Sequence, residues 1–188
     1  MKVLDAKSHK SFEGGASFDL RNRAYRAIWI ASWLLLARWT PPPMHAWRRS
    51  VLRPFGAKVG RNVRIYASTR VWYPPNLVLH DGVLLGPGVN CYNQGLITIG
   101  SNAVVSQGAH LCASTHDISD PHFQLQLKPI EIGSRAWVAA EAFIGPGASV
   151  GEGVVIGARA VFFGSAEPWT VYAGNPARQL KHRKFHRP

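Results

Sequence analysis

An aliphatic residue followed directly by glycine recurs at short intervals from residue 57 onward. The pairs lie at 59–60, 85–86, 99–100, 132–133, 144–145, 150–151 and 156–157. Divided into sixes from Ile132, the chain reads IGSRAW, VAAEAF, IGPGAS, VGEGVV and IGARAV, and similar units start at Val59, Leu79 and Ile99. The first position is aliphatic in nearly every unit and the fifth is mostly small. The period is six, unlike that of a helix or a half-exposed strand.

A six-residue period of this kind predicts an all-β solenoid, the parallel β-helix. Each unit supplies a short strand and a turn, three units close one triangular coil, and the aliphatic positions stack along the axis. Glycine at the second position lets the chain turn the corner without a Cβ clash. We expect an N-terminal arm and helices over residues 1–56, the solenoid over 57–167, and a C-terminal segment over 168–188 with a short basic helix starting at Asn175-Pro176.

The repeat is interrupted once at length, between LCASTH, which ends at His116, and IGSRAW. We predict that residues 117–131 leave the solenoid as a loop. An irregular segment of this length in a compact domain is usually functional or disordered.

The N-terminal region contains one long apolar stretch. Residues 1–24 are polar and suggest an extended arm, whereas 25–39 read YRAIWIASWLLLARW. The apolar run inside this stretch is shorter than the roughly 20 residues that cross a bilayer. It suits either a helix lying on a membrane surface or a helix packed on the rest of the protein. Three prolines at 41–43 end it, and a second helix is expected over Met44–Arg53.

The net charge of +12 is unevenly distributed. Residues 1–70 and 178–188 hold 19 of the 22 Lys and Arg and 3 of the 10 acids, so the flanks carry +16 and the middle −4. No zinc finger, ribonucleoprotein pattern or convincing helix-turn-helix accompanies this charge, so we expect no nucleic-acid partner. Basic flanks suit the phosphates of a cofactor, a lipid-linked substrate or a membrane surface. The start of the chain is unlike a signal peptide and the two cysteines are too few for a disulfide framework, which favours the cytoplasm.

Several segments in order resemble one family. They are FDLRNRAYRAIW, LRPFGAKVGRNVRI, GVNCYNQGLITIG, STHDISDPHF, IEIGSRAWVAAEAFIGPG and VYAGNPARQL. Together they resemble the hexapeptide-repeat acetyltransferases, and within these the colanic-acid-type enzymes of exopolysaccharide biosynthesis. The resemblance implies a left-handed β-helix, a homotrimer, and acetyl-CoA in the cleft between neighbouring prisms.

Transfer of an acetyl group from a thioester to a hydroxyl needs a base, and histidine titrates in a suitable range. The family's base matches His116. Asp117 is a candidate for orienting this histidine or the acceptor, and Tyr92 and Asn93 match acceptor contacts of related sugar enzymes. Cys91 holds an inward position, so we interpret it as a core residue. Direct transfer in a ternary complex is expected.

Further positions match the family's contacts with coenzyme A. Trp137 would form part of the cleft wall, and three small residues would let the pantetheine arm approach the backbone: Ala140, Gly157 and Ala158. Arg178 and Lys181 match cations that meet the phosphates. For each of these residues, ordinary coil packing or a solvated basic tail is the alternative.

The resemblance does not identify the molecule that receives the acetyl group. A sugar or polysaccharide precursor is expected, free, nucleotide-linked or lipid-linked, with work at the inner face of the membrane; another small acceptor is the alternative. A second alternative is a zinc-dependent β-helical hydratase, because four histidines lie at 80, 110, 116 and 122. Their spacing does not match that family, so we expect no metal.

Overall fold

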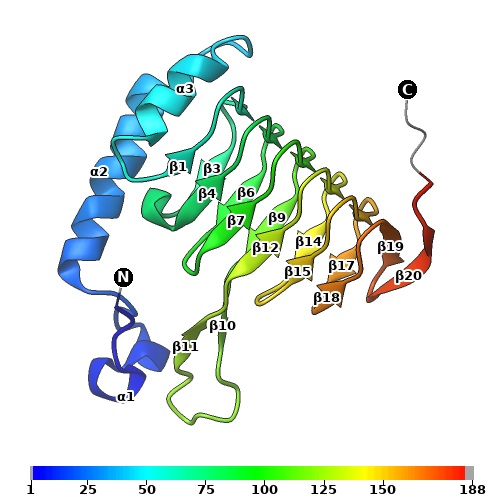
Figure 1. Ribbon diagram of the computed structural model, residues 1–188. Coiled ribbons are helices and arrows are strands. Elements are labelled where there is room, and N and C mark those ends of the chain that lie inside the picture. The colour runs from blue at the N-terminus through cyan, green and yellow to red at the C-terminus, as the bar shows by residue number, and fades with distance from the viewer. Residues whose placement is uncertain (1, 185–188) are drawn as a thin grey trace.

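The computed structural model describes residues 2–184 and contains a triangular β-helix with helices at its N-terminal end (Figure 1). Sheet 1 is made of β1 (Lys58–Val59), β4 (Leu77–Leu79), β7 (Ile97–Ile99), β12 (Ile130–Ile132), β15 (Ser149–Val150) and β18 (Ser165–Ala166). Sheet 2 is made of β2 (Arg64–Ile65), β5 (Leu84–Leu85), β8 (Val104–Val105), β13 (Trp137–Val138), β16 (Val155–Ile156), β19 (Thr170–Gly174) and β20 (Ala177–His182). Sheet 3 is made of β3 (Arg70–Val71), β6 (Asn90–Tyr92), β9 (His110–Cys112), β14 (Phe143–Ile144) and β17 (Val161–Phe162). The predicted solenoid is confirmed.

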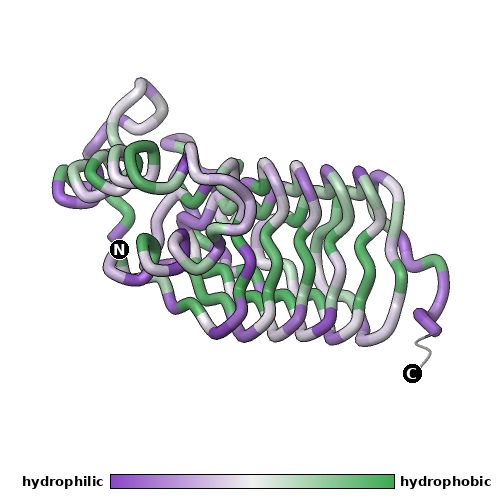
Figure 2. The backbone as a smooth tube through the Cα atoms, turned by 90° about the horizontal axis from the view of Figure 1, so that it is seen from above, coloured by the Kyte–Doolittle hydropathy of each residue, from purple (hydrophilic) through white to green (hydrophobic). Residues whose placement is uncertain are grey.

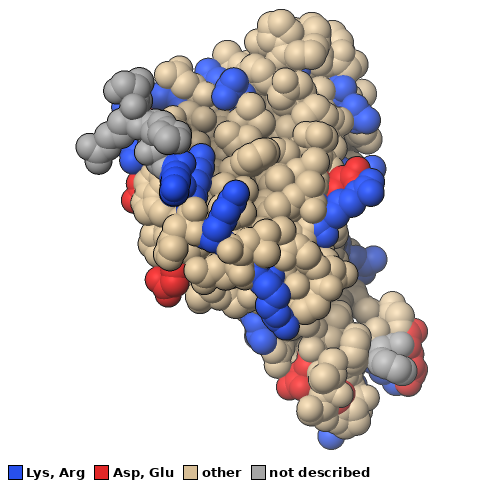
Figure 3. Space-filling view, turned by 90° about the vertical axis from the view of Figure 1, so that its right-hand side faces the viewer, with Lys and Arg blue, Asp and Glu red and all other residues tan. Residues whose placement is uncertain are grey.

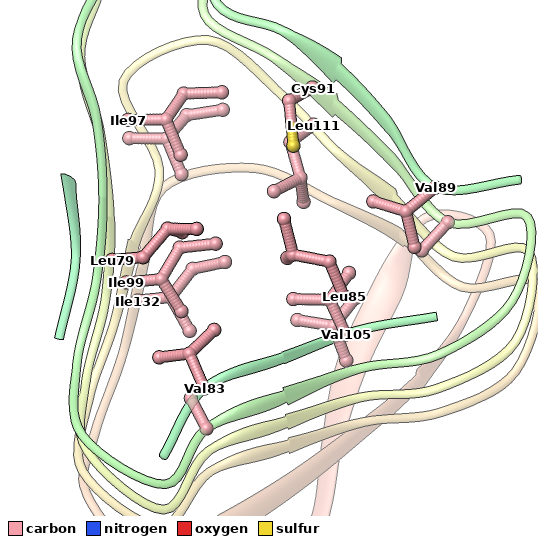
Figure 4. Packing of buried hydrophobic residues seen from close by; sticks show 14 of the residues in the cluster. Leu79, Val83, Leu85, Val89, Cys91, Ile97, Ile99, Val105, Leu111 and Ile132 are labelled. Atoms are coloured by element: carbon pink, nitrogen blue, oxygen red, sulfur yellow. The ribbon is translucent and has the colours of Figure 1, made fainter. Parts of the chain in front are cut away.

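The aliphatic positions of the repeat form columns inside the prism. Ile97 and Ile99 of one coil lie in register with Ile130 and Ile132 of the next, and all four are buried (Figure 4). Hydrophobic segments recur in coil after coil along the solenoid (Figure 2), and their buried side chains form one continuous cluster. Cys91 belongs to such a column, and burial raises the pKa of its thiol to about 12. It is a core residue, as expected.

Glycine at the second position of a unit is required by the close approach of the next coil. A Cβ on Gly133 would lie 2.6 Å from the backbone nitrogen of Glu152. The left-handed backbone conformation at the corners belongs instead to the fourth position, with φ of 58° at Asn102 and 76° at Gly147.

The helices α2 (Leu20–Leu36) and α3 (His45–Leu52) cover the open end of the first coil. Carbonyls of this coil have no preceding coil to pair with, and side chains of the helices donate to them. Trp29 Nε1 donates to the carbonyl of Val71 at 2.7 Å, and Arg49 Nη1 donates to that of Val63 at 2.7 Å. The edge of the solenoid is thereby satisfied without another strand.

Arg48 is the centre of this cap. Its side chain is fully buried and donates to the carbonyls of Ile65, Thr40, Pro41 and Pro42. It also donates to the Thr40 hydroxyl at 3.0 Å. Burial lowers the pKa of the guanidinium. The group still donates these hydrogen bonds, because the carbonyl oxygens around it can only accept. Part of the basic charge of the N-terminal region is therefore structural.

Three expectations differ from the structure near the N-terminus and the loop. Residues before Leu20 are not simply extended, because they form α1 (Ala6–His9), a 3-10 turn (Ser11–Glu13) and a bridge between Val3 and Phe18. The second helix is slightly shorter than Met44–Arg53. The chain leaves the solenoid after Cys112 and returns at Ile130, so LCASTH is not a complete coil unit and the excursion is not 117–131.

The predicted C-terminal helix is wrong. Residues after Asn175-Pro176 form β20, which pairs antiparallel with β19, and β19 itself continues sheet 2 beyond residue 167. The last strand of a solenoid leaves an unpaired edge, and β20 covers it. Residues 185–188 of the predicted segment lie outside the described residues.

Removing the buried guanidinium tests the cap. We expect Arg48→Met to lower the free energy of unfolding by about 3 kcal/mol, because several buried carbonyls lose their donors. Arg64→Met, at an exposed position of β2, should stay near the wild-type value. Chemical denaturation of both variants measures the difference, and equal stability of the two would contradict the role of Arg48.

Candidate active site

A β-hairpin projects from the corner between sheets 3 and 1 (Figure 1). It consists of β10 (Ser114–His116) and β11 (Leu125–Leu127), with His116 opposite Leu125. At its base the amide of Lys128 donates to the carbonyl of Ala113 at 3.0 Å. Gly95 lies directly beneath, where a Cβ would come within 2.5 Å of that carbonyl oxygen. The exit of the hairpin is fixed by this contact.

The ring of His116 is held by the tip of its own hairpin. Its Nδ1 lies 2.8 Å from the carbonyl oxygen of Phe123, and the two rings stack at 4.2 Å with an interplanar angle of 11°. A carbonyl can only accept, so Nδ1 carries the hydrogen and Nε2 keeps its lone pair. This is the tautomer that can take a proton from a hydroxyl.

Asp117 does not orient the imidazole through any hydrogen bond that the described residues show. Its carboxylate accepts from the backbone amide of Ser119 at 3.0 Å and from Nε2 of Gln126 at 3.1 Å. These bonds shape the hairpin. The orienting group is the Phe123 carbonyl, which sequence reasoning did not identify because a main-chain atom carries no residue signature.

The N-terminal arm is fastened to the hairpin by Gln124. The side-chain oxygen accepts from the amide of Ala6 at 2.7 Å, and Nε2 donates to the carbonyl of Leu4 at 3.2 Å. The arm and the outer face of sheet 3 enclose a groove of about 320 Å³. Gln124 was also missed, since nothing in the sequence links it to the arm.

Tyr92 lines this groove from sheet 3. Its hydroxyl accepts from Nε2 of Gln94 at 2.9 Å, and its ring meets those of Trp72 and His110 edge-on. Burial is the first cause of a raised pKa of the Tyr92 hydroxyl, which remains protonated. Arg26 contributes a cation to the same groove, over the Trp72 ring.

Asn93 does not reach the groove, contrary to the expectation from its position in the sequence. Its side chain is fully buried, its Oδ1 accepts from the amides of Trp72 and Tyr73, and its Nδ2 donates to the carbonyl of Tyr73. The side-chain amide of Asn93 pairs with the backbone of the preceding coil, so it is not available to bind an acceptor substrate.

The positions expected to contact coenzyme A lie together on sheet 2 and at its corner with sheet 3. Trp137 is partly exposed on the outer face, and its indole N–H donates to the Ser106 hydroxyl at 2.9 Å. Beside it is a groove of about 490 Å³. Ala140 and Ala158 occupy equivalent corner positions of successive coils, and a Cβ on Gly157 would lie 2.9 Å from that of Ala173.

Arg178 and Lys181 extend this surface, on a strand in place of the predicted helix. Lys181 lies opposite Val171 and Arg178 opposite Ala173 in the pairing of β20 with β19. Lys181 is thereby in line with Trp137 through Val155 and Val171, across neighbouring strands of one sheet. Figure 3, which looks at the end of the solenoid where β20 lies, shows Lys and Arg side chains at that end.

The two halves of the candidate site lie on different corners of the prism. The hairpin with His116 leaves the corner between sheets 3 and 1, whereas Ala140 and Ala158 lie between sheets 2 and 3. Within residues 2–184, no three His, Cys, Asp or Glu side chains are grouped as metal ligands.

No protein-family model matches the sequence. The chain is 38% identical over 174 residues to WcaF of Escherichia coli (strain K12), assigned as a colanic acid biosynthesis acetyltransferase, covering 93% of this chain and 92% of the relative. The chain belongs to this acetyltransferase family.

Solved structures of hexapeptide-repeat acetyltransferases share the fold of this family member. A maltose O-acetyltransferase from Clostridium difficile 630 superposes with a TM-score of 0.80 at 24% identity, over 89% of this chain and 90% of that one. The Vibrio cholerae acetyltransferase VCA0836, complexed with acetyl coenzyme A, gives 0.80 at 19% identity over 91% and 93%. The fold is the left-handed parallel β-helix of these enzymes.

Loosening the arm of this acetyltransferase tests the bond to its hairpin. In Gln124→Leu the carbonyl of Leu4 and the amide of Ala6 lose their partner, so we expect faster hydrogen exchange in residues 3–18. Gln107→Leu, an exposed change at a coil corner, serves as control. Unchanged exchange in the arm of the Gln124 variant would show that other contacts hold it.

Proposed function

We propose that this enzyme transfers an acetyl group from acetyl-CoA to a hydroxyl of a sugar or polysaccharide precursor, with His116 as general base. The observation that carries the proposal is the hydrogen bond from His116 Nδ1 to the Phe123 carbonyl, which leaves Nε2 free to accept a proton. Family membership and the acetyl coenzyme A bound to a structural neighbour support the donor.

The proposed step is direct transfer in a ternary complex. The acceptor hydroxyl oxygen attacks the thioester carbonyl while its proton passes to Nε2 of His116. The C–S bond then breaks, and the sulfur of coenzyme A leaves with the proton from the imidazolium. The buried Cys91 thiol, protonated at neutral pH, is no candidate for an acyl-enzyme intermediate.

We propose that the cofactor lies along sheet 2, where the phosphates meet cations at the β20 end. Trp137 would wall the cleft, small residues at 140, 157 and 158 would admit the pantetheine arm, and Arg178 and Lys181 would face the phosphates. The acceptor would enter the groove beneath the arm, where Tyr92 and Arg26 offer a stacking face and a cation.

The separation of the two halves supports a homotrimer. A base on one corner and a cofactor surface on another meet when the hairpin of one copy reaches the next copy around a threefold axis. We also propose work in the cytoplasm against the inner face of the membrane, which two free cysteines and the apolar N-terminal helix support.

Replacing the base tests the chemistry. We expect His116→Ala to reduce turnover by about 10²- to 10⁴-fold, the range for loss of a general base, while trimer mass and acetyl-CoA binding stay at wild-type values. The matched control is His80→Ala, an exposed histidine on the solenoid. A coenzyme A release assay over free, nucleotide-linked and lipid-linked sugars measures both variants. Near-full turnover by His116→Ala would show that His116 is not the general base.

A mixing experiment tests the shared site. Ala158→Trp should fill the cofactor cleft at an exposed corner and inactivate the enzyme. When this variant is dissociated and reassembled with His116→Ala, mixed trimers contain interfaces with both halves intact, so we expect activity to return to a fraction of wild type. Mixtures that stay inactive would place both halves in one chain.

A further inference from the structure

The solvent-facing side of α2 is apolar along its length. Leu20, Ala24, Ala27, Ala31 and Leu35 follow helical spacing on one face and are all exposed. The helix packs on the solenoid through the opposite face, with Trp29 and Trp33. No helix within residues 2–184 is long and apolar enough to span a bilayer. A contiguous exposed apolar face of this kind marks a protein or membrane interaction site.

The charge around this helix specifies that partner. From Leu20 to His80 the sequence contains eleven Lys and Arg and no Asp or Glu. A second copy of this chain would bring the same cations against each other. An anionic lipid surface is complementary in both respects, since it accepts apolar side chains and attracts arginines.

A groove of about 450 Å³ runs between α2 and the outer face of sheet 3. One wall is apolar and is built by Ile30, Trp33 and Leu34 of the helix. Two guanidinium groups also line the groove, Arg38 just after the end of α2 and Arg70 on β3. Both arginines are exposed, and neither forms an ion pair with an acid among the described residues.

Trp33 contributes to the wall of this groove. Its side chain is 7% exposed, and its indole N–H is buried with no acceptor in the part of the chain that the structure describes. Because the indole N–H is closed off, the exposed guanidinium groups of Arg38 and Arg70 are the charged donors of the groove, and two such groups suit an anionic oxygen.

We propose that this groove binds the phosphate group of a long-chain lipid, presented by a bilayer on which the exposed face of α2 rests. Ile30 and Leu34 belong both to the groove wall and to the exposed apolar surface, so a lipid can enter from the membrane side. Trp72 lines this groove and the groove beneath the arm. If the proposed acetyl transfer holds, on which this part rests, a lipid phosphate here would deliver its sugar toward the arm and hairpin.

Vesicle flotation of the full chain tests the site by binding alone. The vesicles are phosphatidylcholine, phosphatidylcholine with phosphatidylglycerol, and phosphatidylcholine with a polyprenyl phosphate. We expect flotation with both anionic vesicles and little with phosphatidylcholine. Equal binding to the two anionic vesicles identifies a membrane phospholipid as the ligand, and tighter binding to the polyprenyl phosphate identifies a carrier lipid.

Paired variants separate the groove from general charge. Arg38→Gln and Arg70→Gln should each weaken binding to anionic vesicles about five- to tenfold, whereas Arg64→Gln removes the same charge on sheet 2 and should leave it within twofold. Leu35→Asp, on the exposed face, should abolish flotation. Thermal unfolding verifies that each variant folds.

Absence of wild-type flotation, or equal loss in Arg70→Gln and Arg64→Gln, would overturn the proposal. Acetyl transfer to a water-soluble sugar is measured separately. It can fail while vesicles still bind, or persist when they do not, so the lipid site and the proposed reaction are judged independently.

Discussion

Unpaired carbonyl groups at the open end of the first coil govern the N-terminal half of the molecule. A parallel solenoid pairs each coil with the next, so its first and last strands have no partner on one side. At the far end β20 adds an antiparallel strand. At the near end the partners are side-chain donors, and Arg48 joins the carbonyl of Ile65 in the first coil to three carbonyls of the segment between α2 and α3. Arginine suits this task because its guanidinium has five donors and no acceptor.

This cap also determines which face of α2 is exposed. Trp29 must point inward to donate to the carbonyl of Val71, and Trp33, one turn later, packs beside it. The opposite side of the helix is therefore turned outward whatever residues it carries. That side is apolar in this chain, and no segment within residues 2–184 covers it. One helix, α2, therefore both donates to the unpaired carbonyls of the first coil and presents an apolar face that needs an external partner.

The repeat predicted the solenoid because every unit places the same residue types at the same inward positions. An irregular unit therefore does not obscure the period that its neighbours share. Isolated signals were less reliable. Asn175-Pro176 resembles a helix start, but the free edge of β19 required a strand there, and the tertiary demand prevailed. Asn93 was expected at the surface, yet its amide completes the hydrogen bonds of two backbone amides in the preceding coil. His116 was predicted as the base from its motif, whereas the carbonyl that accepts from its ring depends on the left-handed backbone at Phe123, which no motif records.

The arginines of the N-terminal region therefore do two kinds of work that composition cannot separate. Arg48 is buried among carbonyls and contributes to stability through short-range bonds that salt screens weakly. Arg38 and Arg70 are exposed beside an apolar wall, where their interaction with an anionic partner falls with ionic strength. A basic sequence of this type carries a structural charge and an interaction charge within one region of the chain. Only the position of each guanidinium relative to the first coil distinguishes them.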